Sequence, residues 1–557
     1  MPNEIYHRSE WGNPKPLGWG NIYFDADATN ELYKRSDNYE NSDGTDEILR
    51  DISNKASIVL TPTAYDNGSI NTVIPTYGFG SELVTNGTFD TNSDWTKGTG
   101  WSISGGKAVA VLADNTILNQ TQTTTLNQIY KVVYTVSDYE NGSVRFQFSG
   151  GGGNTIGVVR NSNGTYTEYI KSLFNHTNYR FKALTTDGGF TGKIDNLSVK
   201  EVTEADFDFT RASIATRVNE KGLIEEVASN IPRIDYTRGF GSWLLEPQST
   251  NLITYSEDFS QWGTVNGAVV TDNFTTSPDG TQNAAKVVYD GTSLGRIEIS
   301  TGASGTNTQS IYLKTVSGTQ AVSIGASSSD LTEVTVTSEW QRFTHTGSGS
   351  YPRVLCNDAA TIYVWGAQLE QKSFATSYIP TEGSTVTRSA DVANNSGNAD
   401  MFNDSEGVLY ANISALADDD TTRRFSISDG TNDDRVLIGY SSSNRLQYVV
   451  SDGGSVVVNK LITVDDITTQ NKTAFKYKLN DCAVWINGFE VDTDLVATMP
   501  SGLNTLNFDQ ANGTENFYGK TKELAVFKEA LTDAELESLT SWISFVEMAT
   551  DLEYTLE

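Results

Sequence analysis

Two long stretches of the chain begin and end with the same sequence pattern. Each begins just after the tetrapeptide Gly-Phe-Gly-Ser, at residues 78–81 and at residues 239–242. The matching segments that follow are 83–95 with 252–262 at the start, and 193–201 with 362–370 at the end. The spacing between start and end is nearly equal in the two copies. Internal self-similarity indicates one structural unit used twice, so we predict a divergent tandem repeat of one β-sandwich.

Strand signals dominate the rest of the chain. Apolar and polar residues alternate in 129–136 and in 144–148, and Asn141-Gly142 between them predicts a two-residue hairpin. The 48 glycines, 25 tyrosines and 23 phenylalanines, with only 4 methionines, are typical of strand-and-turn proteins. A chain of 557 residues is too long for one hydrophobic core. We therefore predict an all-β protein made of several sandwich domains.

The last quarter of the chain predicts a further β domain that ends in a helix. Strand-like residues 475–479, 484–486 and 489–491 are separated by turns at Asn480-Asp481 and Asn487-Gly488, a pattern that predicts an antiparallel meander. Thr532-Asp533-Ala534-Glu535 is a capping box. The apolar stripe of the predicted helix consists of Leu536, Leu539, Trp542, Ile543 and Val546.

The middle of the chain lacks the residues for a core of its own. Short apolar alternations at Phe207/Phe209 and Leu223/Ile224 are interrupted by turn and breaker residues. Such a segment can be ordered only by lying on neighbouring domains. We interpret it as an extended connector, clamped between the β domain before it and the β domain after it.

Three parts of the sequence resemble known families. The connector blocks 207–213, 222–225, 230–233 and 245–252 resemble the connector of tailed-bacteriophage virion appendage proteins, which are head fibres or tail fibres. Each copy of the repeat resembles a carbohydrate-binding module of the galactose-binding-like jelly-roll type. The last domain resembles a concanavalin A-like, or laminin-G-like, lectin sandwich. These resemblances imply a structural protein of a virion that binds host-surface glycan for attachment.

The pattern and the resemblances together give a predicted domain order. It is an N-terminal virion-anchoring segment at 1–80, a first jelly roll at 81–202, the connector at 203–248, a second jelly roll at 249–382, a linker at 383–403 and the concanavalin A-like domain at 404–557. In the first segment, Trp11 and Trp19 are either aromatic anchors in a partner groove or fold back on the first sandwich.

Charge and targeting signals limit the partners. A net charge of -31 argues against binding nucleic acid or an anionic membrane surface. The sequence has neither a signal peptide nor a membrane-spanning stretch, so synthesis in the host cytoplasm followed by assembly into a virion is expected. Cys356 and Cys482 fall in different predicted domains and are expected to be free buried thiols. By analogy with fibres we expect a homo-oligomer, with a trimer favoured.

No motif for catalysis or cofactor binding is evident. His7, His176 and His345 lie in polar settings, and His345 with Cys356 is the only catalytic pair close in sequence. No zinc spacing, phosphate loop or dinucleotide fingerprint occurs, so we predict no catalytic residue, metal ligand or cofactor. Calcium could be held by the acidic runs 418–420 and 429–434, although neither matches an EF-hand loop.

Two further possibilities stay open. The carboxylates Glu490, Asp492 and Asp494 faintly resemble the acid pair of a concanavalin-like glycoside hydrolase, so a glycan depolymerase is the runner-up, and a purely structural capsid decoration protein is the third class. Sugar-binding residues cannot be assigned. Aromatic candidates for sugar stacking, each more simply interpreted as a core residue, are Trp95, Trp101, Trp262, Trp340, Trp365 and Trp485.

Overall fold

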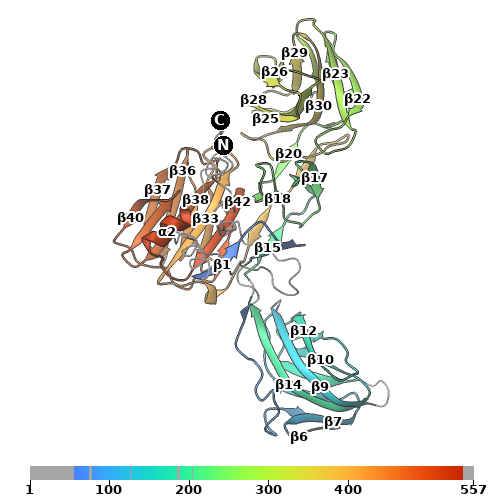
Figure 1. The fold of residues 1–557 in the computed structure, drawn as a ribbon, viewed down its shortest axis with the longest axis vertical. Helices are drawn as coiled ribbons and strands as arrows, with labels where there is room; N and C mark the ends of the chain where they lie inside the picture. The colour runs from blue at the N-terminus through green and yellow to red at the C-terminus, as the bar shows by residue number, and fades with distance from the viewer. Residues whose placement is uncertain (1–54, 74–77, 127, 185–188, 204, 543–557) are drawn as a thin grey trace, which may run out of the picture. The chain divides into compact units, whose positions relative to one another are not determined.

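The computed structural model describes residues 55–73, 78–126, 128–184, 189–203 and 205–542. Trp11 and Trp19 of the predicted anchor, and Ile543 and Val546 of the predicted helix stripe, lie outside the described residues. The chain divides into two compact units, one made of residues 75–204 and one made of the chain before 75 and after 204. No helix in the described part of the chain has the length and hydrophobicity that crossing a bilayer requires. The fold is almost entirely β, as predicted (Figure 1).

The first unit is a sandwich of two antiparallel sheets. Its strands are β4 (Gly78–Phe79), β5 (Thr96–Lys97), β6 (Trp101–Ser104), β7 (Lys107–Ala113), β8 (Ile117–Thr121), β9 (Ile129–Asn141), β10 (Val144–Gly150), β11 (Gly153–Ile156), β12 (Gly164–Lys171), β13 (Asn178–Ala183) and β14 (Phe190–Thr203). One sheet has the order β12-β9-β14-β7-β6, with β4 added on β14, and the other has the order β11-β10-β13-β8-β5. Alternating apolar residues of both sheets fill one core, where Tyr134 of β9 contacts Phe181 of β13 edge to face.

The predicted hairpin at Asn141-Gly142 is wrong. β9 and β10 do not pair with each other: β9 pairs with β12 and β14, and β10 pairs with β11 and β13 in the opposite sheet. The chain crosses from one sheet to the other at this turn. Both strands still bury one face in the shared core, so the alternation in the sequence is the same for a hairpin and for a crossing.

The second sandwich has the same topology, strand for strand. Its strands are β21 (Gly263–Val265), β22 (Val269–Thr275), β23 (Ala284–Asp290), β24 (Gly295–Glu298), β25 (Thr306–Thr315), β26 (Gln320–Ser327), β27 (Asp330–Val336), β28 (Gln341–Ser348), β29 (Arg353–Cys356) and β30 (Ala359–Glu370). Its sheets run β28-β25-β30-β23-β22 and β27-β26-β29-β24-β21. These orders reproduce those of β5 to β14, so the predicted tandem repeat is present in the strand order.

Details of packing repeat as well. In the first sandwich the rings of Phe89 and Trp95 lie 5.2 Å apart, and the short helix η5 (Phe259–Gln261) places Phe259 5.0 Å from Trp262 in the second. Each indole donates to a main-chain carbonyl of its own opening segment, Trp95 Nε1 to Asn86 at 3.1 Å and Trp262 Nε1 to Tyr255 at 3.0 Å. The first segments of the two copies therefore pack their Phe and Trp rings in the same way.

The C-terminal sandwich has a larger sheet and a smaller one. The larger contains β33 (Glu406–Ala415), β38 (Asn471–Lys478), β39 (Cys482–Ile486), β40 (Phe489–Asp494) and β42 (Gly519–Phe527), and the smaller contains β34 (Arg423–Ser428), β35 (Arg435–Tyr440), β36 (Arg445–Asp452), β37 (Ser455–Thr463) and β41 (Thr505–Asn507). The meander predicted around Asn487-Gly488 is confirmed by the β38-β39-β40 pairing. Both turn residues have positive φ, 52° and 89°, as a tight hairpin requires.

A single helical element closes this sandwich. Helix α2 (Asp533–Thr540) begins at the predicted capping box, in which the Thr532 and Glu535 side chains each accept from the other's backbone N–H. Its buried residues Leu536 and Leu539 belong to a cluster that includes Trp485 and Tyr410 from the larger sheet. The helix therefore covers the face of that sheet that is turned away from the main core.

Part of the predicted anchoring segment belongs to this sandwich. Strand β1 (Ala56–Leu60) pairs antiparallel with β42, and Leu60 lies opposite Leu524. Strands β2 (Tyr65–Asp66) and β3 (Ser69–Ile70) form a small sheet with β15 (Phe207–Thr210) and β32 (Val392–Asn394). Ile58, Leu60 and Ile70 are fully buried. Residues near position 60 are thus structural members of a domain whose strand β33 begins more than 340 residues later in sequence.

The connector, expected to be clamped between the β domains before and after it, packs on the C-terminal sandwich. Its strands β18 (Ile234–Asp235) and β19 (Ser242–Leu245) extend the larger C-terminal sheet, where Trp243 pairs with Thr521 of β42. Phe207 and Phe209 lie in the same core as Phe508. The segment has no core of its own, as expected, but the surface on which it packs comes from the end of the chain. Local sequence patterns carry no signal for so distant a partner.

The predicted linker at 383–403 is ordered. Strand β31 (Val386–Arg388) pairs with β20 (Ser249–Asn251), β32 pairs with β15, and the short helix η6 (Ala399–Met401) follows. Arg388 and Asp391 are 1% exposed. The Gly, Ser and Asn content reflects tight turns between short strands, such as those at Gly383 and Gly397, whose φ values are positive.

Candidate functional site

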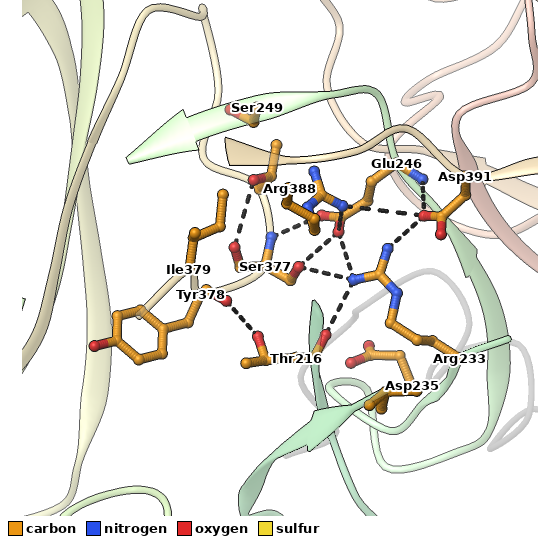
Figure 2. Close-up of polar contacts among 12 residues, drawn as sticks. Thr216, Arg233, Asp235, Glu246, Ser249, Ser377, Tyr378, Ile379, Arg388 and Asp391 are labelled. Atoms are coloured by element: carbon orange, nitrogen blue, oxygen red, sulfur yellow. Dashed lines mark hydrogen bonds and ion pairs between the residues drawn. The ribbon is translucent and has the colours of Figure 1, made fainter. Parts of the chain in front are cut away.

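A cluster of buried charges lies where the chain enters and leaves the second sandwich (Figure 2). Arg233 is at its centre. One terminal nitrogen of Arg233 donates to Glu246 at 2.7 Å, to the Ser377 hydroxyl at 2.8 Å and to the Thr216 carbonyl at 3.0 Å. Its other terminal nitrogen donates to Asp391. Both terminal nitrogens of the fork therefore meet carboxylate oxygens, whereas Nε has no acceptor within the described residues.

Two further arginines complete this buried ion cluster. Arg388 donates to Glu246 and to the Pro247 carbonyl at 2.7 Å. Arg211 donates to the second carboxylate oxygen of Asp391 at 3.1 Å. The side chains of all five charged residues are at most 3% exposed. Three guanidinium groups against two carboxylates leave one net positive charge in a site without water access.

The electrostatics hold Glu246 and Arg233 in their ionised forms. Burial by itself would raise the pKa of Glu246, but the positive charges of Arg388 and Arg233 outweigh it and lower that pKa far below its usual range. Burial likewise opposes the charge on Arg233, and Asp391 and Glu246 reverse the effect and raise its pKa. The carboxylates are saturated with donors. They cannot act as acid, base or nucleophile, so the cluster is a structural clasp and not a catalytic site.

The cluster explains the sequence blocks of the connector. Arg211, Arg233 and Glu246 each come from a different block, and β20 and β31 bring the two passes of the chain together beside them. A small cavity that adjoins Arg388 of the cluster, and is otherwise lined by Thr216, Glu226, Tyr378 and apolar neighbours, has a volume of about 20 Å³. That volume holds about one water molecule and excludes a sugar or cofactor.

The predicted carboxylate pair is not arranged as a catalytic pair. Asp492 and Asp494 lie on β40 and both contact Lys460 of β37, at 3.2 and 3.4 Å. A register shift between Asp492 and Glu490 inserts Val491 as an extra residue. Desolvation by itself would lower the pKa of Lys460, but Asp492 and Asp494 together outweigh it and raise that pKa. Both aspartates are therefore compensated by a fixed cation at a partly exposed strand.

The histidine and cysteine candidates are also separated. His345 contacts Thr332 at 2.8 Å and Asp330 at 3.3 Å, whereas Cys356 donates to main-chain carbonyls in the opposite sheet. Burial raises the pKa of the Cys356 thiol, which disfavours the reactive thiolate. His176 is buried against Phe148, and burial lowers its pKa. His7 lies outside the described residues.

The remaining candidates are structural in the described part of the chain. Five of the six tryptophans are at most 6% exposed and lie in hydrophobic clusters, namely Trp95, Trp101, Trp262, Trp365 and Trp485. Trp340 is half-buried and donates to the Thr276 carbonyl. In the acidic runs, Asp419 pairs with Arg423 at 2.6 Å and Asp434 accepts from the Ser501 backbone. No group of three or more metal-ligating side chains occurs within the described residues.

The first sandwich also has a polar face, which is not among the sites expected from the sequence. Three neighbouring strands of the five-stranded sheet turn polar side chains outward at alternate positions, away from the aromatic core. These positions are Arg145, Gln147 and Ser149 on β10, Lys182, Arg180 and Asn178 on β13, and Asn119 and Thr121 on β8. We call this set the β8-β10-β13 face. Ile156 of β11, 54% exposed, flanks it beside Gln147.

Hydrogen bonds hold the side chains of this face in place. Arg180 Nε donates to Asn119 at 2.7 Å, and Asn119 donates to Asn178 at 3.0 Å. Arg145 Nε donates to Gln147 at 3.4 Å. Within the described residues, the terminal nitrogens of both guanidinium groups have no protein acceptor. Gln147 and Ser149 are only 5% and 3% exposed, so the face presents its other polar side chains to solvent, at a spacing of about 5 Å across strands and about 7 Å along them.

Fold and face together define a multidomain β-sandwich protein with an open polar sheet surface. No family model matches the chain, and no curated protein matches it. Among solved structures, it is similar to the CBM40 module of Ruminococcus gnavus IT-sialidase bound to α2,3 sialyllactose, with 16% identity over 27% of this chain and 94% of that chain and a TM-score of 0.23.

Two longer matches have lower identity. The CBM22 tandem domain of Paenibacillus barcinonensis Xyn10C matches with 10% identity over 52% of this chain and 97% of that chain, at a TM-score of 0.18. Trypanosoma rangeli sialidase in complex with sialic acid matches with 10% identity over 87% of this chain and 96% of that chain, at a TM-score of 0.22. Likeness at these values defines neither an activity nor a ligand.

Proposed function

We propose that this chain is a glycan-binding structural protein of a tailed phage virion, a head fibre or tail fibre that attaches to host-surface polysaccharide. The observation that carries glycan binding is the β8-β10-β13 face. Sugar hydroxyls are recognised by donors and acceptors held in fixed positions next to apolar surface. Arg180, Asn119 and Asn178 supply the polar groups, and Ile156 supplies the apolar flank.

The virion location is supported by the connector. Its blocks resemble those of phage appendage proteins, and Arg211, Arg233 and Glu246 from these blocks meet in the buried ion cluster. A clasp of this kind fixes the base of a sandwich that projects from the chain, which suits a fibre that must present its binding modules. In this proposal the N-terminal residues attach the protein to other virion proteins, and the fibre is a homo-oligomer, with a trimer favoured.

A binding role has more support than a hydrolytic one. Two of the three carboxylates that would serve a glycanase, Asp492 and Asp494, are paired with Lys460 at a strand that carries an extra residue. Retaining hydrolysis needs two carboxyl groups about 5 Å apart that are free to act on the scissile bond.

A glycan array tests the proposal. We expect the full chain to bind host polysaccharide, to keep that binding in the Glu490→Ala and Asp492→Ala variants, and to release no reducing ends from the polysaccharide. Release of reducing ends that is lost in these variants would establish a glycanase instead. Stable incorporation into particles without any glycan binding would favour a decoration protein.

Location and assembly state need separate measurements. We expect mass spectrometry of purified particles to find the chain, and immunogold labelling to place it on a projecting fibre. Light scattering of the purified full chain is expected to give three times the mass of one chain. Absence from particles would contradict the virion assignment without affecting glycan binding.

A further inference from the structure

Three cations on the β8-β10-β13 face have no acidic partner. Arg145, Arg180 and Lys182 lie on two adjacent strands, and within the part of the chain that the structure describes none of them forms an ion pair. Lys182 donates only to the Asn115 carbonyl, at 2.7 Å. In the described part of the chain, three basic residues without a carboxylate partner therefore lie together on the surface that we propose to bind glycan.

The arrangement costs stability. Arg145 and Lys182 are directly opposite each other in the antiparallel pair of β10 and β13. Like charges at opposed positions of a sheet repel, and this pair has no carboxylate between its members to offset the repulsion. A local arrangement that opposes folding and has no structural compensation is expected at a functional site.

The second sandwich provides an internal comparison. Its matching sheet also turns two arginines outward, Arg296 on β24 and Arg353 on β29. There Glu298 accepts from Arg296 at 2.9 Å and lies 3.2 Å from Arg353. The arginines of the second sandwich are thus paired with a carboxylate, whereas, among the described residues, the cations at the matching sheet of the first sandwich are not. The difference lies in the side chains and not in the fold.

We infer that the β8-β10-β13 face binds a carboxylated polysaccharide, with sugar carboxylates on the terminal nitrogens of Arg145 and Arg180 and with Lys182 adding a third positive charge. Two parallel N–H groups of a guanidinium match the two oxygens of a carboxylate. Asn119 and Asn178 then receive the neighbouring hydroxyls. This inference rests on the proposed function, because it names the chemical class of the glycan.

The test measures binding of the full chain to three polymers: alginate, a carboxylated polysaccharide; dextran, a neutral one; and dextran sulfate. We expect alginate to bind, dextran to bind far more weakly, and the affinity for alginate to fall as salt rises. Arg145→Gln and Arg180→Gln should each lower the affinity for alginate about tenfold. Arg296→Gln in the second sandwich is the matched control, since it removes the same charge and should leave the affinity unchanged.

Each other outcome has a definite meaning. Alginate binding that survives both substitutions on the first sandwich would overturn the inference while leaving glycan binding intact. Equal affinity for dextran sulfate would overturn the assignment to carboxylates. Binding to dextran alone would overturn the acidic class, and binding to none of the glycans would remove the proposed function as well. Hydrogen exchange of residues 144–149 and 178–183 that is unchanged in the variants shows that the sheet is intact.

Discussion

The guanidinium of Arg233 and the carboxylate of Asp391 form an ion pair in which neither side chain is exposed to solvent, although 158 residues separate them in the sequence. The whole second sandwich lies between the two positions. Their contact therefore ties the point where the chain enters that sandwich to the point where it leaves. This ion pair therefore helps to order the connector blocks, which have no hydrophobic core of their own. We call the ordered region around it the joint.

Removal of Arg233 tests the joint. Arg233→Met would leave Glu246 and Asp391 each with fewer cationic partners in a dry site. Breaking a buried ion pair from one side costs about 3–5 kcal/mol, and we expect a loss of that size in the free energy of unfolding of this unit. Urea unfolding followed by hydrogen exchange of residues 242–251 measures it.

Arg217→Gln is the control for that experiment. Arg217 pairs with Glu225, whose side chain is 38% exposed. An exposed pair contributes at most about 1 kcal/mol. A loss for Arg233→Met no larger than that for Arg217→Gln would show that the cluster does not hold the joint together.

Acid should weaken the same unit. The pKa of Glu246 in the folded protein lies well below its ordinary value of 4.5, so the stability it contributes is present above about pH 4.5 and is lost as the pH falls toward the folded pKa. We expect Glu246→Gln to be less stable than the unchanged protein at pH 7 and to lose less stability between pH 4.5 and pH 3. An equal fall in the free energy of unfolding of the two proteins between pH 4.5 and pH 3 would contradict this role of Glu246.

The first sandwich should respond to pH in a higher range. Burial lowers the pKa of His176 from its ordinary 6.5, and acceptance by the Gly150 and Gly153 carbonyls only partly offsets it. The unfolded chain thus binds a proton more readily than the folded one, and stability falls as the pH drops below about 6.5. Hydrogen exchange of residues 144–156, corrected for intrinsic rates, is expected to show less protection at pH 5.5 than at pH 7.5. His176→Gln should remove most of that difference, and an equal difference in the variant would contradict the prediction.

The matched tryptophans should contribute to stability and not to glycan binding. Trp95 and Trp262 fill equivalent places in the two sandwiches and are at most 5% exposed. Each change to Ala is expected to destabilise its own sandwich by about 3–5 kcal/mol. Affinity for glycan, measured well below the melting temperature of the variant, should change little. A large loss of affinity in a variant that is still folded would make these rings ligand contacts.

Local chemistry predicted the elements that depend on a few neighbouring residues. The hairpin at Asn487-Gly488 and the capping box of Thr532 and Glu535 are both correct, because turn and cap preferences act over two to four residues. The prediction of a hairpin at Asn141-Gly142 is wrong because turn preferences act only over these few residues. Its turn is local, but whether the next strand pairs with the previous one or crosses to the other sheet is decided by the whole sandwich.

Long-range partners could not be predicted from one sequence. Nothing near Arg388 or Asp391 indicates that their partners are Glu246 and Arg233, and the apparent linker composition of residues 383–403 hides them. The β8-β10-β13 face did leave a signal. Arg145 and Gln147 alternate with buried aromatic residues, as Asn178, Arg180 and Lys182 do. Which strands lie side by side, and so which cations meet, follows only from the topology.

The most direct test of the account is a crystal structure of the full chain with a bound acidic oligosaccharide. The account predicts an intact, uncleaved ligand over β8, β10 and β13, with carboxylates on Arg145 and Arg180 and no ligand on the matching sheet of the second sandwich. A ligand seated between Glu490 and Asp494, or cleaved there, would contradict it.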